Sequence, residues 1–213
     1  MKASLPLLAL LAMAAPAAAA ERDPAGAYRL VGEQDVASGL VLRSDGRFQY
    51  FLSAGALDER AEGRWSASGG LVKLVTEPAP RPPVFEQSPP ARTGGAALSV
   101  MVNSPQGSGI AGVDVRVGFD GGEPVESYTQ EDGWSLPPEE KRTPRWIELS
   151  VPMHGLASPR FPIDLGRGNK LAFTLIPNDL GIVDFAGVRV EAAGKALIVH
   201  RGGARLRYER ARR

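Results

Sequence analysis

Three acidic residues close together, Asp58, Glu59 and Glu62, are the group in this chain with the most direct link to chemistry. Two carboxylates roughly 5–9 Å apart can cleave a glycosidic bond, one as general acid and the other as base or nucleophile. Neighbouring acids also occur in solvated loops without any chemical role. A carboxylate-dependent, glycosidase-like hydrolase is therefore the alternative function, and it requires Asp58 or Glu62 to face another carboxylate across a cleft.

Residues suited to nucleophilic or metal chemistry are few. The chain has no cysteine and two histidines, His154 and His200, which lie far apart in the sequence. Ser53 lacks the preceding glycine of a Gly-x-Ser-x-Gly elbow. The acidic turns at residues 120–123 and 131–133 do not match a calcium-binding loop. The sequence therefore predicts no catalytic residue, no metal ligand and no cofactor, with calcium at these turns as the remaining alternative.

The aromatic side chains offer a second kind of site, a platform on which sugar rings stack. Trp and Tyr combine a large apolar face with a polar group, so they serve both as ligand-binding residues and as core anchors. Trp65 falls inside an expected strand and is assigned to a core, whereas Trp134 lies at a turn shortly after Tyr128. We therefore take Trp134 and Tyr128, together with Asp58 and Glu62, as the candidate ligand-binding residues.

The charge of the chain excludes one class of partner. The formal net charge is +1 at pH 7, from 25 basic and 24 acidic residues. A nearly neutral chain has no general field to attract nucleic acid. Near the C-terminus, Leu206 and Tyr208 alternate with Arg205 and Arg207, which indicates a strand with its arginines toward solvent.

The first twenty residues have the pattern of a secretory signal peptide. Lys2 is followed by an apolar run at residues 7–13, and small residues at 18–20 precede Glu21. We expect cleavage near Ala20 and a periplasmic or secreted product. In the mature chain we expect no transmembrane segment, because no later apolar run is long enough, and no lipid anchor, because no cysteine follows the cleavage point.

Short strands and turns are expected in the mature chain, since the sequence contains 25 Gly and 18 Pro. Asp45-Gly46 between two alternating apolar runs is a strong hairpin signal. Residues 54–60 are interpreted as a loop or one helical turn. Strands are expected at residues 27–31, 39–43, 47–51, 60–66 and 71–76, before a proline-rich stretch.

A second group of strands follows the prolines. Ser99-Val-Met-Val-Asn-Ser-Pro-Gln-Gly is followed by Ile110-Ala-Gly-Val-Asp-Val-Arg-Val and then by Tyr128-Thr-Gln-Glu-Asp-Gly-Trp134. This stretch resembles a transthyretin-like module of the carboxypeptidase-regulatory type, which has a strand, a Pro-x-Gly…Gly-Val turn, a second strand and a later Thr-x-x-x-Gly. The resemblance implies a seven-stranded β-sandwich that is usually not catalytic.

The C-terminal strands, expected at 185–191, 196–200 and 204–208, return to the tight hairpins of the N-terminal segment. Five strands before the prolines and these three make eight, enough to close a small antiparallel barrel. We therefore predict an all-β fold in which a barrel, lipocalin-like in architecture only, is split by an inserted sandwich. The predicted parts are a signal peptide (1–20), a discontinuous meander or barrel-like domain (24–80 plus 180–210), a proline-rich connector (81–95) and a transthyretin-like sandwich (96–178). The alternative is two consecutive sandwiches with a boundary near residue 90.

These features predict a non-catalytic binding or scaffolding module of the cell envelope. Its partner would be an envelope protein, a glycan or a small apolar ligand, the last held in the mouth of the barrel. A hollow barrel favours such a ligand. An interior filled by neighbouring apolar side chains argues against it, and those expected to fill it are Leu40, Leu42, Phe48 and Leu74.

Overall fold

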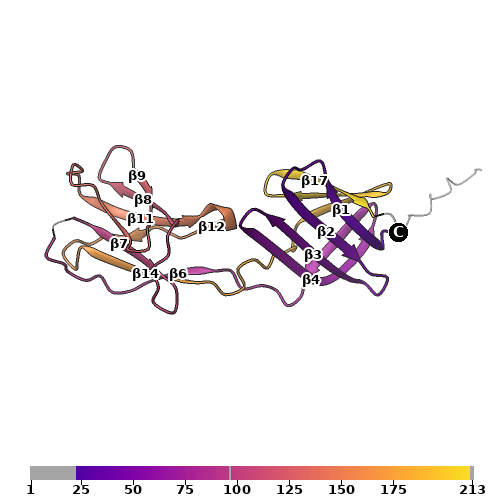
Figure 1. The fold of residues 1–213 in the computed structure, drawn as a ribbon, viewed down its shortest axis with the longest axis horizontal. Helices are drawn as coiled ribbons and strands as arrows, with labels where there is room; N and C mark the ends of the chain where they lie inside the picture. The colour runs from indigo at the N-terminus through magenta and orange to yellow at the C-terminus, as the bar shows by residue number, and fades with distance from the viewer. Residues whose placement is uncertain (1–22, 96, 212–213) are drawn as a thin grey trace, which may run out of the picture.

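The computed structural model describes residues 23–95 and 97–211, and its regular structure consists of seventeen β-strands and one 3₁₀ turn, η1 (Pro152–His154). The prediction of an all-β fold is therefore confirmed. The predicted signal peptide, residues 1–20, lies outside the described residues. Figure 1 shows the strands gathered into two bodies joined by two extended segments.

Eight strands close into an antiparallel barrel in the order β1-β17-β16-β15-β5-β4-β3-β2. Strands from both ends of the chain thus complete one sheet, with Tyr28 of β1 opposite Arg210 of β17. The barrel strands are β1 (Gly26–Val31), β2 (Val36–Leu42), β3 (Arg47–Ala54), β4 (Leu57–Ser68), β5 (Leu71–Thr76), β15 (Arg189–Ala193), β16 (Ala196–Arg201) and β17 (Ala204–Arg210).

Glycine pairs make two of the barrel hairpins. Gly69 and Gly70 join β4 to β5 with φ of 59° and 75°, and Gly202 and Gly203 join β16 to β17 with φ of 58° and 77°. A two-residue turn whose twist matches that of the strands needs positive φ at both positions, which glycine adopts without steric cost. These turns fix the register of the strands on either side.

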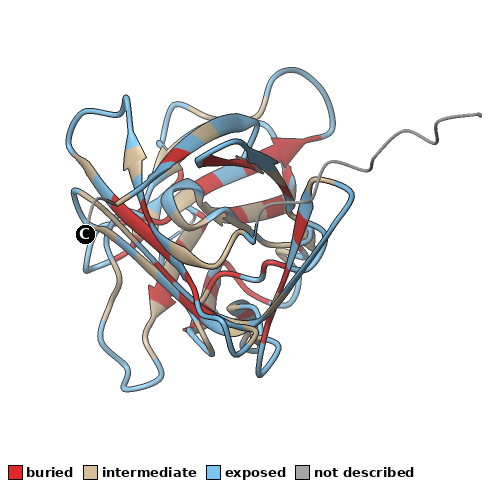
Figure 2. Ribbon diagram, turned by 90° about the vertical axis from the view of Figure 1, so that its right-hand side faces the viewer, coloured by how far each residue is buried: buried red, intermediate tan, exposed pale blue. Residues whose placement is uncertain are grey.

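Apolar side chains fill the interior of the barrel. Leu40, Leu42, Phe48 and Leu74 are each at most 1% exposed. Figure 2, which views the molecule from the barrel end, shows buried and exposed stretches alternating along the strands. Phe185, which precedes β15, adds its ring to this core, 5.5 Å from the Phe48 ring and 4.9 Å from the Tyr50 ring in edge-to-face geometry. The barrel therefore has the filled interior that argues against an internal ligand.

The segment before β15 corrects one prediction. A strand was expected from residue 185, but β15 begins at Arg189. Residues 181–183 instead lie beside β4, where the Arg60 amide donates to the Gly181 carbonyl and the Val183 amide donates to the Arg60 carbonyl. β4 needs this partner because β5 pairs with it only from Gly63 onward. The loop or helical turn expected at 54–60 is also wrong, because β3 and β4 pair from Leu57 onward after a tight turn.

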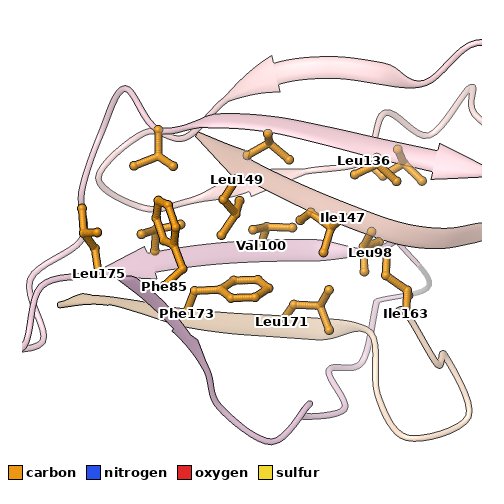
Figure 3. Packing of buried hydrophobic residues seen from close by; sticks show 14 of the residues in the cluster. Phe85, Leu98, Val100, Leu136, Ile147, Leu149, Ile163, Leu171, Phe173 and Leu175 are labelled. Atoms are coloured by element: carbon orange, nitrogen blue, oxygen red, sulfur yellow. The ribbon is translucent and has the colours of Figure 1, made fainter. Parts of the chain in front are cut away.

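The second body contains two facing sheets. One has the order β10-β7-β14-β6, and the other has β12-β11-β8-β9 with β13 also paired to β11. Figure 3 shows their apolar side chains meeting in a core, with Ile147 and Leu149 facing Val100 and Phe173. The strands are β6 (Val84–Gln87), β7 (Ser99–Asn103), β8 (Asp114–Phe119), β9 (Val125–Tyr128), β10 (Trp134–Ser135), β11 (Pro144–Val151), β12 (Leu156–Ala157), β13 (Phe161–Pro162) and β14 (Lys170–Ile176).

Part of the predicted connector belongs to this body. Residues 84–87, inside the expected connector 81–95, form β6, which pairs with β14 and buries Phe85 in the core. A strand between prolines is tolerated here because β6 is an edge strand, where missing amide donors cost little. The two extended segments between the bodies are joined to each other, with the Arg81 amide 2.8 Å from an Asp179 carboxylate oxygen.

Candidate functional site

Asp58 and Glu62 lie on the outer wall of the barrel, both exposed, on alternate outward positions of β4. They are four positions apart along an extended strand, a distance of about 13 Å. That spacing exceeds the roughly 5–9.5 Å that glycoside hydrolysis requires between its two carboxyl groups. The structure therefore does not bring these two candidates together as a catalytic pair.

The aromatic candidates are also apart. Trp134 is half-buried against the sandwich core on β10, while Tyr128 is 58% exposed on the edge strand β9 of the other sheet. Trp146 lies over Gly118 on one side, and the Arg160 guanidinium is 4.1 Å from its ring centroid. Trp134 belongs to the other sheet, and Tyr128 and Trp146 lie opposite Asp114 and Gly118, which are four positions, about 13 Å, apart along β8. The structure therefore does not bring the candidates Trp134 and Tyr128 together on one stacking platform.

A polar network, which the sequence analysis missed, lies inside the barrel at the end nearest the sandwich. Arg201 and Glu59 form a bidentate ion pair, with guanidinium-to-carboxylate N–O distances of 2.5 and 2.6 Å. Arg201 also donates to the Tyr50 hydroxyl at 3.3 Å. The Ser38 hydroxyl lies 2.9 Å from that of Tyr208 and donates to a backbone carbonyl. The charges are mostly covered, with 28% of the Arg201 side chain and 12% of the Glu59 side chain exposed.

The environment of this network shifts the pKa of three of its groups. Burial, with the neighbouring Tyr208 as a smaller cause, raises the pKa of Tyr50 well above 10, and burial likewise raises that of Tyr208. The hydrogen bond from Arg201 to Glu59 raises the pKa of the guanidinium further. Both phenols stay neutral and the arginine stays charged at physiological pH, and both Glu59 carboxylate oxygens accept hydrogen bonds from that arginine.

The open site lies on the outer wall. The hollow that we call the connector groove, with a volume of about 630 Å³, runs between the outer face of β2, β3 and β4 and the extended segments. Its floor is two cross-strand rows, Gly39–Phe51–Arg60 and Val41–Gln49–Glu62. Its far wall includes Pro78, Pro80, Asp179 and Ile182.

Phe51 is the main apolar surface in the connector groove. Its side chain is 53% exposed, although strand residues of this size are usually covered. The ring rests on Gly39, where an added Cβ would lie 2.6 Å from Phe51 Cε1. Val41, 36% exposed, continues the apolar floor. Pockets of 300–1,000 Å³ with a mostly apolar lining and a few polar groups are typical of small-ligand sites.

Two charged groups at this floor are available to a ligand. In the part of the chain that the structure describes, the side chains of Arg60 and Glu62 make no hydrogen bond or ion pair with another residue. Asp179, by contrast, is engaged by Arg81. The groove therefore combines an apolar floor with a free guanidinium and a free carboxylate.

Comparisons with family models, with curated proteins and with solved structures give no match to this chain. In residues 23–95 and 97–211, no helix has the length and apolar character needed to cross a membrane.

Proposed function

We propose that this protein is a non-catalytic binding module that works outside the cytoplasm, and that its ligand occupies the connector groove on the outer barrel wall. The location follows from the signal-peptide pattern of the first twenty residues. Among the partners expected from the sequence, the small apolar ligand fits the groove best, and the charged groups at the groove floor extend this class to amphipathic molecules.

The observation that carries the proposal is the contrast between the two faces of β2 and β3. Inside the barrel, Leu40, Leu42 and Phe48 are at most 1% exposed and leave no room for a ligand. Outside it, Val41 and Phe51 face a hollow of about 630 Å³. An exposed aromatic ring held against a sheet by a glycine is a preorganised contact surface, which lowers the entropic cost of binding.

The test begins with the mature protein purified from its own secretory route and examined by native mass spectrometry for a retained small molecule. Phe51→Ser should then lower retention about tenfold or more, because burying a phenylalanine side chain is worth about 1.5–3 kcal/mol. Leu71→Ser is the matched control, since Leu71 is 48% exposed on the barrel wall away from the groove. Equal retention by both variants, or no retained molecule, would contradict the proposal.

A further inference from the structure

A row of arginines continues the floor of the connector groove. Arg43, Arg47 and Arg64 occupy the next outward positions of β2, β3 and β4 or their turn, with Arg47 directly opposite Arg64. The Arg43 amide donates to the Arg47 carbonyl, which holds the first two beside each other. Strand geometry places this row about 13 Å from the Phe51 row.

The arginine row and the connector groove are continuous. The three arginines line a second hollow of about 300 Å³, and four of its six other lining residues also line the groove: Gln49, Glu62, Glu77 and Pro78. A molecule lying along the wall therefore passes from an apolar surface to a basic one without leaving the lined space.

The charges at the basic end favour one anionic group. Arg64 is paired with Glu77 at 3.2 Å, and Arg43 donates to Gln49 at 2.9 Å. The Arg47 guanidinium makes no hydrogen bond or ion pair within the described chain, so it is free to bind an anion. Glu62, midway along the floor, disfavours a second negative charge there. The matching ligand is apolar along its length and anionic at one end.

Resting on the proposed function of this same groove, we infer that its ligand is a single-chain anionic amphiphile of the long-chain carboxylate class. The alkyl chain lies on Phe51 and Val41, and the carboxylate binds Arg47 by charge-assisted hydrogen bonds. The groove is bounded on its far side by Pro78, Pro80 and Ile182, and a site between two walls favours a free monomer over a flat membrane surface.

Titration of the full mature protein with laurate, below its micelle-forming concentration, tests this inference by calorimetry and by the methyl NMR signals of Val41 and Ile182. Laurate should bind and shift both signals. Arg47→Gln should weaken binding about tenfold, which corresponds to about 1.4 kcal/mol. Arg205→Gln, an exposed arginine on the outer face of β17, should leave the affinity unchanged.

The remaining arms separate failure of this inference from failure of the proposed function. Equal binding of laurate and dodecyltrimethylammonium, abolished by Phe51→Ser and untouched by Arg47→Gln, would overturn the anionic class but keep the groove as the site. Binding only to phosphatidylglycerol vesicles, without a laurate complex, would also overturn it. Laurate binding that ignores both Phe51→Ser and Arg47→Gln would place the ligand elsewhere and overturn both proposals.

Discussion

Replacing Phe185 by alanine should destabilise the barrel while leaving the sandwich nearly unchanged. Phe185 is 1% exposed and contacts the rings of Phe48 and Tyr50, although it comes from an extended segment and not from a barrel strand. Removing a buried phenylalanine side chain costs about 3–5 kcal/mol, because transfer energy and a residual cavity both contribute. That is a large part of the 5–15 kcal/mol that stabilises a typical domain.

Urea titration followed by amide NMR separates the two bodies, since Ala61 reports on the barrel and Ile147 on the sandwich. Phe185→Ala should lower the midpoint of the Ala61 signal and leave that of Ile147 in place. Phe173→Ala, which removes a fully buried ring from the other core, should do the reverse. Equal shifts of both signals in either variant, or a loss below about 1 kcal/mol, would refute the assignment of Phe185 to a separate barrel core.

Three further predictions concern the same barrel. Gly63→Ala should lower the free energy of unfolding by about 2 kcal/mol, because the new Cβ would lie 2.0 Å from the Val75 carbonyl oxygen; a thermal melt measures this. Glu59→Gln should cost about 2 kcal/mol in urea denaturation, less than a fully buried pair, because water still reaches part of Arg201. Burial raises the pKa of Tyr50 in the folded state, so the contribution of this residue to the free energy of unfolding is complete below the unfolded pKa near 10 and is lost as pH rises above it. The free energy of unfolding, measured by urea denaturation, should therefore be lower at pH 11 than at pH 9, and Tyr50→Phe should reduce this difference.

The barrel strands could be predicted from the sequence because short segments contain both the alternation of apolar residues and the turn signals. Alternation placed Leu40 and Leu42 on one face, and Asp45-Gly46 indicated the hairpin that pairs β2 with β3. β6 was missed because the prolines on either side of it outweighed the alternation in Val84-Phe85-Glu86 when propensity alone was considered. Pairing with β14, ninety residues later, decides that segment, and no short window contains it.

The strand alternation in the sequence did indicate the polar network, but Glu59 and Arg201 are charged and were not expected to face the interior. Glu59 and Arg201 occupy the inward positions of the alternations that include Ala61 and Val199. The two-residue alternation of these strands places both charged side chains inside the barrel, where they can form an ion pair. An isolated inward charge is costly in an apolar interior, so a pattern with one on each of two distant strands indicates a pair.

The connector groove could not be found in the sequence. The groove depends on the register that places Phe51 opposite Gly39, and on Ile182, which follows the second body in the sequence. The floor of the groove, within residues 39–62, and two residues of its far wall, Asp179 and Ile182, are more than one hundred positions apart. Composition and motifs therefore favoured Trp and Tyr as binding residues, whereas the exposed ring on the wall is a phenylalanine.

The most direct test of the binding site compares adjacent residues on opposite faces of β2. Intermolecular NOEs from the alkyl protons of bound laurate should reach the methyl groups of Val41 and Ile182 on the outer wall. The methyl groups of Leu40 and Leu42, one residue away but inside the barrel, should show none. NOEs to Leu40 and Leu42 would place the ligand in the interior and contradict the account.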